Sequence, residues 1–362
     1  MKVPILLPNI FNYPFTYNSD NNLKVGDYVL VPFGKKKMVG MVWNHFEPKK
    51  NKSFEIKKVI RKLKIKSLSI NTIKFLNWFS EYNLIPKGMS LKLHLLSNEA
   101  IEEVFYKEYE IYKSIKKTNN FKLSKEQEKS LKELKIKNAK FRVHVLQGTT
   151  GSGKTIVYFN AIKEKIDQGY QGLILLPEIG LTTEFEKKFY DFFGFIPAIW
   201  HSGISKKKKK IIWSGLVNGK IKVVIGARSS LFLPFKKLGI LIVDEEHDQS
   251  YKQDEGVIYN ARDMAIARAN FESIPINLVT AVPSIETYAN IKNNKYSSSR
   301  LINRYKEASL PTYEIIDLKK NKLSKKNWIS LETVNQAKKH LKLGDQILFF
   351  INRRGFAPYV LC

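Results

Sequence analysis

Short apolar runs alternate with longer mixed stretches through the middle of the chain. The runs cover residues 141–147, 172–177, 196–200, 222–225, 238–243 and 276–279. Continuous apolar runs of this length are typical of parallel strands buried on both faces, and the stretches between them are long enough for helices. The pattern therefore predicts an α/β domain with a parallel sheet. Each run ends in glycine, small polar or acidic residues, so the loops that follow are expected at one edge of that sheet.

The pattern changes on both sides of this domain. Residues 1–97 predict a small β-rich domain, with a hairpin of strands 25–34 and 38–43 and a helix that begins at Asn71 as its cap. Residues 98–122 are polar and predict a linker, and 123–305 form the central domain. Residues 306–362 predict the start of a second α/β lobe, with strands at 313–317 and 346–351 around a helix at 331–341.

One glycine-rich loop fits the phosphate-binding P-loop pattern without a mismatch. It follows the run at 141–147 and precedes a stretch with apolar residues at helical spacing. In such a loop, backbone N–H groups and the start of a helix bind phosphate, the lysine reaches the β- and γ-phosphates, and the last hydroxyl holds Mg²⁺. The expected ATP-binding residues are Gly148, Thr149, Thr150, Gly151, Ser152, Gly153, Lys154 and Thr155.

A second signal lies in the run at 238–243, which ends in Asp244-Glu245-Glu246-His247. Acidic residues at the carboxyl end of a buried strand fit the second half of a nucleotide site. We expect Asp244 to hold Mg²⁺ together with Thr155, and Glu245 to orient the attacking water. The catalytic set expected from both motifs is Lys154, Asp244, Glu245 and His247.

Gln127 has two interpretations. With Ser124 it forms a capping-box pattern at the start of a helix. It also lies about twenty residues before the P-loop, where many helicases place a glutamine that reads adenine. The two roles exclude each other only in part, so Gln127 is counted among the ATP-binding residues.

The composition favours a polyanionic partner and a reducing compartment. Lysine and arginine total 62 against 33 acidic residues, for a formal net charge of +29. Most of these cations are lysines, which AT-rich coding also favours, so runs such as Lys206–Lys210 are better explained as solvated loop. No apolar run approaches the roughly eighteen residues of a membrane span. A single cysteine, Cys362, allows no internal disulfide, and we expect a cytoplasmic protein.

Several motifs together resemble one family, the replication-restart DNA helicases of the primosomal protein N′ (PriA) type, in the DExH class of superfamily 2. They are Gln147–Thr155, Leu175–Thr182, Trp200–Gly203, Gly226–Phe232, Val243–His247 and Asn352–Pro358, with Val31–Gly34 near the N-terminus. The resemblance implies an ATP-dependent 3′-to-5′ helicase that recognises branched DNA and initiates primosome assembly. It implies ATP and Mg²⁺ as cofactors, and single-strand-binding and primosome proteins as partners.

The same resemblance implies DNA-binding residues. The N-terminal domain would hold a DNA 3′ end near Phe15, Gly34 and Lys35, and Arg228 would contact the strand. Residues 248–263 resemble the family's aromatic-rich loop, which senses single-stranded DNA. In that loop Tyr251 and Tyr259 are expected to stack on bases, and Lys252 and Arg262 to meet phosphates.

Three departures from the family pattern qualify these expectations. Val282 replaces a threonine in the Thr280-Ala281-Val282 motif, and about twenty-five residues at 98–122 are too few for a winged-helix domain. Cys362 aligns with the first ligand of the family's zinc insertion, and one thiolate cannot make a Cys₄ site, so no Zn²⁺ is expected in this chain. We expect a monomer. Because the sequence does not include the family's second-lobe arginine finger, we expect it to bind ATP and DNA with little turnover.

Two other functions remain open from the sequence. One is a non-catalytic protein that binds DNA forks and keeps a vestigial nucleotide site. The other is an ATP switch in protein assembly, which the DNA-related motifs disfavour.

Overall fold

The computed structural model describes residues 1–44, 56–95, 112, 121–134, 140–177, 182–304, 312–320, 323, 327 and 329–350. The chain divides into two compact units, residues 1–308 and 309–362. The predicted boundaries near residues 97 and 122 both fall inside the first unit.

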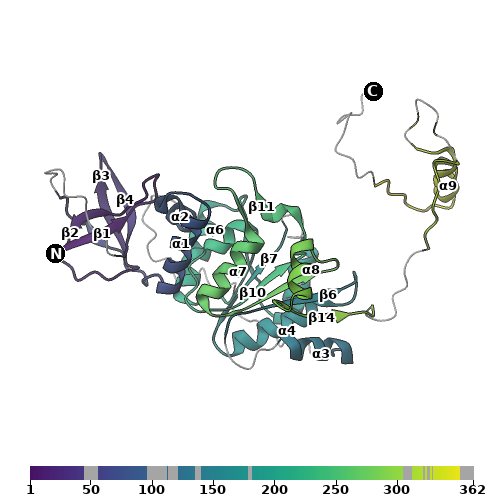
Figure 1. Cartoon of the computed structure of the whole chain (residues 1–362), viewed down its shortest axis with the longest axis horizontal. Coiled ribbons are helices and arrows are strands. Elements are labelled where there is room, and N and C mark those ends of the chain that lie inside the picture. Colours follow the sequence, from purple (N-terminus) through teal and green to yellow (C-terminus); the bar gives the residue numbers. More distant parts are fainter. Residues whose placement is uncertain are drawn as a thin grey trace. The chain divides into compact units, whose positions relative to one another are not determined.

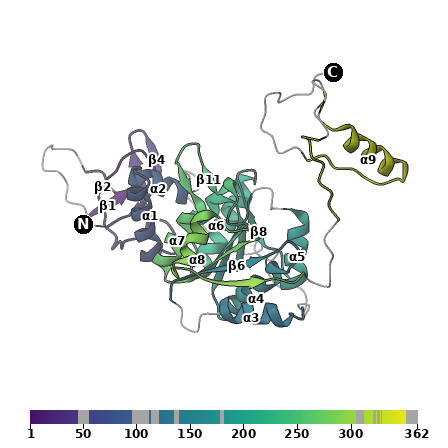
Figure 2. The ribbon, with the colours of Figure 1, turned by 45° about the vertical axis from the view of Figure 1, so that its right-hand side comes forward.

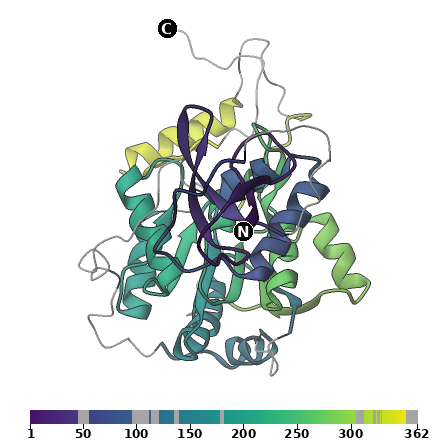
Figure 3. The same ribbon diagram turned by 90° about the vertical axis from the view of Figure 1, so that its left-hand side faces the viewer.

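The N-terminal part of the first unit contains a five-stranded antiparallel sheet, drawn in purple in Figure 1 and seen from its own side in Figure 3. Its strands are β1 (Lys2–Leu6), β2 (Phe15–Asn18), β3 (Tyr28–Phe33), β4 (Lys36–Val42) and β5 (Arg61–Lys62), in the order β2-β1-β4-β3-β5. The predicted hairpin is confirmed as β3 and β4. Gly34, with φ of 60°, lies in its turn, a backbone conformation that favours glycine.

Two helices follow this sheet, α1 (Ile70–Tyr82) and α2 (Lys87–His94). The prediction that Asn71 caps the first helix is wrong. Ser69 is the cap, since its hydroxyl accepts a hydrogen bond from the Thr72 N–H at 3.1 Å, and Asn71 lies in the first turn. Serine and asparagine are both good N-cap residues. In the structure the cap lies two residues before the predicted one.

The rest of the first unit is built on a seven-stranded parallel sheet of order β14-β6-β13-β10-β7-β9-β8. Its strands are β6 (Arg142–Gly148), β7 (Gln171–Leu175), β8 (Ala198–Trp200), β9 (Val223–Gly226), β10 (Leu238–Asp244), β13 (Pro275–Thr280) and β14 (Ser297–Leu301). All six predicted strands are present, and β14 is an additional one at the sheet edge. The predicted class, a parallel helicase-like α/β fold with a β-rich N-terminal region, is confirmed.

Helices cover both faces of this sheet (Figure 2). One face packs against α3 (Lys125–Leu134), α4 (Lys154–Asp167) and α5 (Thr183–Phe193). The other packs against α6 (Lys206–Asn218) and α7 (Ala261–Glu272), and α1 of the N-terminal part joins the same core; α8 (Ile285–Lys292) follows β13. The buried runs predicted for the strands therefore have apolar cover on both sides, as a parallel sheet requires.

A buried polar network joins the N-terminal helices to the motor sheet. Nδ1 of His94 lies 2.8 Å from the carbonyl of Phe232, and Nε2 lies 2.7 Å from the hydroxyl of Tyr28. Because a carbonyl only accepts, Nδ1 carries the proton and Nε2 accepts from the tyrosine. Trp213 donates to the His94 carbonyl at 3.1 Å, and the buried Arg268 donates to the carbonyls of Leu231 and Leu233. The N-terminal part is therefore fixed to the loop after β9.

Two sequence-based expectations outside this core are wrong. The lysine run at 206–210 is not a loop: it forms the exposed first turns of α6, capped by the Ser205 hydroxyl. In the second unit the predicted helix is confirmed as α9 (Leu331–Lys342), but the described residues of 312–317 and 346–350 form no strand. A strand is stable only with a hydrogen-bonded neighbour, and the described part of this unit supplies none. In the described residues no helix is long and apolar enough to cross a membrane.

Candidate nucleotide and nucleic-acid sites

The P-loop has the conformation that its sequence predicts. It begins at the end of β6, and α4 starts at Lys154. Gly151 and Gly153 both have φ of 83°, in the left-handed region that favours glycine. The loop is thus turned so that a new helix begins directly at a strand end, the arrangement that binds phosphate through backbone N–H groups.

Two polar side chains inside the loop are arranged for a ligand. Ser152 has a buried hydroxyl without a hydrogen-bond partner among the described residues. Nζ of Lys154 donates to the Gly148 carbonyl at 2.8 Å, and the residue is 9% exposed. An unpaired buried hydroxyl and a folded-back lysine both gain partners when a phosphate enters the loop. These features fit ATP.

Gln127 performs its capping role and also contacts the P-loop. Its Oε1 accepts from the Ser124 N–H at 3.0 Å, and its Nε2 donates to the Ser152 carbonyl at 3.0 Å. The side chain, 3% exposed, therefore ties α3 to the P-loop. The adenine-reading role remains a prediction, because both ends of the amide already have partners in this structure.

Asp244 and the P-loop helix are linked by Tyr158, a residue that belongs to neither sequence motif. The hydroxyl of Tyr158, on α4, donates to Oδ2 of Asp244 at 2.7 Å. The side chain of Thr155 lies within reach of the same hydroxyl. Burial raises the pKa of Asp244 to about 6, although the Tyr158 hydrogen bond acts in the opposite direction. The two predicted Mg²⁺ ligands, Thr155 and Asp244, are thus brought to one place by Tyr158.

Glu245 and His247, which follow Asp244, connect the end of β10 with the end of the neighbouring strand β13. Glu245 has φ of 47°, a strained conformation for a residue with a side chain. The hydroxyl of Thr280 donates to the Val282 carbonyl at 2.8 Å, so it accepts from Nδ1 of His247, also at 2.8 Å. His247 is therefore held between Glu245, 3.7 Å away, and the end of β13. This arrangement lets His247 connect the nucleotide site with the Thr280–Val282 motif.

Glu246 is a functional-site residue that the sequence analysis did not assign. Its carboxylate is fully buried and accepts from the Ser284 N–H at 2.8 Å and the Thr287 hydroxyl at 2.9 Å. Arg262 lies 3.3 Å away and also donates to the Ser284 hydroxyl at 2.7 Å. The expectation that Arg262 meets DNA phosphate does not fit this arrangement, because the guanidinium is buried and engaged with Glu246 and Asp263.

The two tyrosines of the aromatic-rich loop (residues 248–263) are also inside the protein. Tyr251 is 1% exposed and Tyr259 is 4% exposed. The Tyr251 hydroxyl lies 3.0 Å from the Leu175 carbonyl and 2.5 Å from the Asp244 carbonyl, and burial raises its pKa well above the ordinary value. The expectation that both rings stack on bases does not fit this structure. Tyr251 instead anchors the loop to the ends of β7 and β10.

Two cations near this loop, the exposed Lys252 and the half-buried Arg228, lie on neighbouring loops. Lys252 is exposed and pairs with Asp254 at 3.2 Å. Arg228, at the start of the 3₁₀ helix η3 (Arg228–Phe232), donates to the Lys252 carbonyl at 2.6 Å. The loop after β9 and the aromatic-rich loop are therefore joined at the carboxyl edge of the sheet, and DNA contact by Arg228 and Lys252 remains a prediction.

An aromatic cluster marks the expected 3′-end site in the N-terminal domain. The ring of Phe15 lies 5.3 Å from those of Phe11 and Tyr13 and 5.4 Å from that of Phe33. Tyr13 is 43% exposed, and a Cβ at Gly34 would meet no atom within 4 Å. Lys35 is exposed in the same turn. Open backbone, exposed aromatic surface and a cation are the chemistry of a single-strand end site, whose ligand remains a prediction.

The expected metals differ in how well the chain fits them. Mg²⁺ is commonly bound by one or two protein oxygens plus substrate phosphates, and Thr155 and Asp244 provide such a pair at the P-loop. No group of three or more His, Cys, Asp or Glu among the described residues is arranged to hold a metal by itself. Cys362 and the Asn352–Pro358 motif lie outside the described residues, as do residues 178–181 of the Leu175–Thr182 motif.

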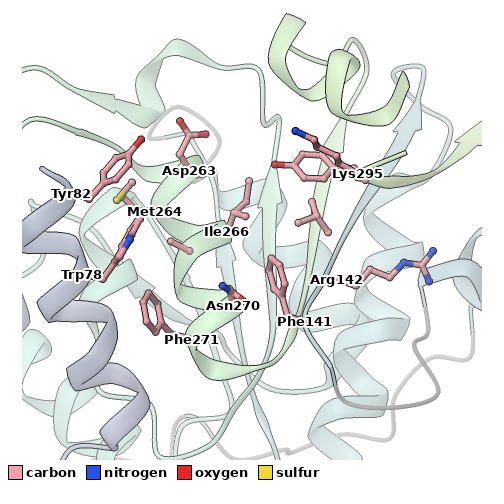
Figure 4. A pocket seen from close by; sticks show the side chains of 13 residues that line it. Trp78, Tyr82, Phe141, Arg142, Asp263, Met264, Ile266, Asn270, Phe271 and Lys295 are labelled. Atoms are coloured by element: carbon pink, nitrogen blue, oxygen red, sulfur yellow. The ribbon is translucent and has the colours of Figure 1, made fainter. Parts of the chain in front are cut away.

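A separate pocket of about 600 Å³ lies at the opposite, amino edge of the sheet (Figure 4). Residues from α1, α7 and the start of β6 line it, including Trp78, Tyr82, Phe141, Phe271 and Arg142. Since the P-loop is at the other end of β6, this pocket is distinct from the nucleotide site.

Comparisons with known proteins agree with the geometry. A family model of DEAD/DEAH box helicases matches residues 124–291, and a model of the 3′ DNA-binding domain (3′BD) of PriA matches residues 2–95. The replication restart protein PriA of Rickettsia conorii is 44% identical over 99% of this chain and 54% of that protein. PriA of Bacillus subtilis is 33% identical over 77% of this chain and 34% of that protein. The chain thus spans about half the length of the curated Rickettsia relative it matches.

Two of the solved structures to which the chain is similar each match about half of it or more. RecG bound to a three-way DNA junction is 25% identical, with a TM-score of 0.39 over 51% of this chain and 24% of that one. The helicase MrfA is 17% identical, with a TM-score of 0.42 over 64% of this chain and 36% of that one.

Proposed function

This chain belongs to the PriA family of replication restart proteins, and we propose that it binds ATP and branched DNA as part of a 3′-to-5′ DNA helicase. In this proposal residues 1–97 bind DNA 3′ ends, 98–122 link them to the motor, and 123–305 form the ATP-binding lobe. Residues 306–362 would contribute to a second lobe. A cytoplasmic monomer that works with primosome and single-strand-binding proteins belongs to the same proposal.

The observation that carries the proposal is the hydrogen bond between Tyr158 and Asp244. It joins the helix of the P-loop to the acidic end of β10, so both halves of the nucleotide site are assembled in one fold. A glycine turn and an acidic turn that had no common function would not need a buried tyrosine to connect them.

The chain's own residues define what the site would do. The P-loop backbone and Lys154 would hold the β- and γ-phosphates, and Ser152 would donate its unpaired hydroxyl to the same group. Mg²⁺, held by Thr155 and Asp244, would neutralise phosphate charge. Glu245, at the strained position after Asp244, would orient water against the γ-phosphate.

Two parts of the chain would couple DNA contact to the nucleotide site. Arg228 and the aromatic-rich loop are hydrogen-bonded to each other, and Tyr251 connects that loop to the main chain of Asp244. A strand that moves Arg228 or Lys252 would therefore also shift the end of β10. The N-terminal domain would add a fixed 3′-end site, because His94 holds α2 to the loop after β9, and Arg268 of α7 holds that loop in turn.

The amount of turnover separates this proposal from the alternative of a vestigial site. We expect ATP binding with hydrolysis that depends on Glu245, because this carboxylate would orient the attacking water. Hydrolysis should be measured with and without a fork that has a single-stranded gap, for the parent chain and Glu245→Gln. DNA-stimulated hydrolysis that Glu245→Gln abolishes supports a helicase motor. ATP binding without any hydrolysis in either chain would favour the non-catalytic fork-binding protein.

The 3′-end assignment has its own test. A fork with a free 3′-hydroxyl should bind more tightly than the same fork with a 3′-phosphate, because a pocket at Phe15 and Gly34 would be shaped for the uncharged end. Fluorescence anisotropy at several salt concentrations measures both. Equal binding of the two forks at every salt concentration would attribute the interaction to lysine charge alone, which does not depend on the terminus.

A further inference from the structure

The amino edge of the motor sheet, opposite the nucleotide site, carries a group of lysines that the proposed function does not use. We name Lys66, Lys165, Lys222, Lys236 and Lys237 the amino-edge basic surface. Lys222 precedes β9 and Lys237 precedes β10, and the strand between them, β7, follows Tyr170. Because these strands are parallel neighbours, the residues before them meet at one edge.

Hydrogen bonds fix the backbone of this surface. The Gly172 N–H donates to the Lys222 carbonyl at 2.9 Å, and the Gln171 N–H donates to the Lys237 carbonyl at 2.8 Å. The Gln171 side chain accepts from the Lys237 N–H at 3.0 Å. The backbone positions of Lys222 and Lys237 therefore keep a fixed spacing.

The lysine side chains crowd one another here. The Lys66 amino group, from the N-terminal part, lies within hydrogen-bonding reach of that of Lys236, and its charge lowers the pKa of Lys236. Nζ of Lys237 lies 4.7 Å and that of Lys165 5.8 Å from the centre of the Tyr170 ring. No carboxylate of the described residues lies within ion-pair distance of Lys66, Lys236 or Lys237. Two adjacent ammonium groups repel each other, and an anion between them removes that repulsion.

We propose that the amino-edge basic surface binds the phosphate backbone of duplex DNA, at a site separate from the 3′-end and motor contacts. Three neighbouring strand starts span about 10 Å, over which a duplex presents roughly six phosphate charges. Single-strand sites need open aromatic faces for stacking, whereas the Tyr170 ring at this surface already has the amino groups of Lys165 and Lys237 near its face. The proposal goes beyond the proposed function, in which DNA meets the carboxyl edge and the N-terminal domain.

The test uses a duplex closed by hairpins at both ends, which offers no 3′ end and no single strand. The whole chain is compared with Lys66→Ala/Lys236→Ala/Lys237→Ala, and the matched control is Lys338→Ala/Lys339→Ala/Lys342→Ala on α9. All six lysines are exposed, so both triple variants remove the same charge from the surface. Binding is measured by anisotropy between 50 and 200 mM salt.

Three phosphate contacts contribute about 2.7 to the slope of log K against log salt for duplex DNA. We expect the amino-edge variant to lose about that much slope, so that its affinity falls about 40-fold less than that of the parent chain over this salt range. The α9 control should keep the parent slope. The proposal is overturned if the parent chain does not bind the closed duplex, if the amino-edge variant keeps the parent slope, or if both variants lose slope equally. Loss of ATP binding or of 3′-end discrimination would refute the proposed function and leave this result unaffected.

Discussion

His94 provides a sharp test of how the N-terminal helices are attached to the motor. Its ring is buried between Tyr28, Trp213 and the Phe232 carbonyl, and Arg268 lies nearby. Burial lowers the pKa of His94 from 6.5 to about 4, and the positive charge of Arg268 acts in the same direction. The folded protein therefore prefers the neutral imidazole that the two hydrogen bonds require.

The sign of the pH effect follows from this shift. Below pH 6.5 the unfolded chain takes up a proton at this histidine and the folded chain does not until about pH 4. Stability from His94 is fully present above pH 6.5 and is lost as the pH falls toward 4. At pH 5 the two pKa values give a loss of about 2 kcal/mol in the free energy of unfolding relative to pH 7.

The perturbation is His94→Gln, which removes the titrating group and keeps a donor and an acceptor at this position. The variant will be less stable at pH 7, but its fall between pH 7 and pH 5 should be about 2 kcal/mol smaller than in the parent chain. Urea unfolding at both pH values measures this difference. Tyr28→Phe is the matched control, since it removes the hydrogen bond and keeps the buried imidazole. An equal fall for the parent chain and His94→Gln would refute the assignment of His94 as a buried neutral base.

Two further predictions concern the nucleotide site. Tyr158→Phe removes one hydrogen bond to the Asp244 carboxylate, and a bond to a charged group contributes about 1.5–3 kcal/mol. The affinity for ATP with Mg²⁺ should therefore fall about 10-fold or more, while the affinity for ATP in EDTA changes little. Titration calorimetry measures both affinities, and an equal loss in EDTA would mean a general packing defect. Glu246→Ala removes the fully buried carboxylate beside Arg262, which keeps Asp263 as a partner, so the free energy of unfolding should fall by about 3 kcal/mol, the lower end for breaking a buried ion pair. A loss below about 1 kcal/mol in urea unfolding would contradict the buried network.

The parallel sheet was predictable because most of its strands are continuous apolar runs. β14 is not such a run and was not predicted. Its residues, Ser-Ser-Ser-Arg-Leu, are mostly polar. The strand pairs in parallel with β6, and His144 on β6 adds side-chain contacts, 2.8 Å from the Ser297 hydroxyl and 2.9 Å from that of Ser299. Contacts between residues about 150 positions apart leave no periodic signal in the sequence.

The candidate site was likewise predictable only in part. The P-loop and Asp244 were predictable because each motif has its chemistry in consecutive residues. Tyr158 belongs to neither motif and was not predicted, although its position three residues after Thr155 puts both on one helix face. Tyr251 and Arg262 were expected at the DNA, since aromatic and cationic residues suit that role. Their burial depends on Leu175 and Glu246, distant partners that only the fold brings together.

The most direct measurement of the central claim is ATP binding by the parent chain and by Lys154→Ala, with Mg²⁺ present. A fluorescent ATP analogue titrated into both should bind the parent chain at one site and Lys154→Ala at least 10-fold more weakly, because the lysine is the cation that the P-loop offers to the β- and γ-phosphates. Circular dichroism should show the same fold for the two chains, since Lys154 contributes only contacts to the loop backbone. Equal affinity of the two folded chains for the analogue would contradict the account.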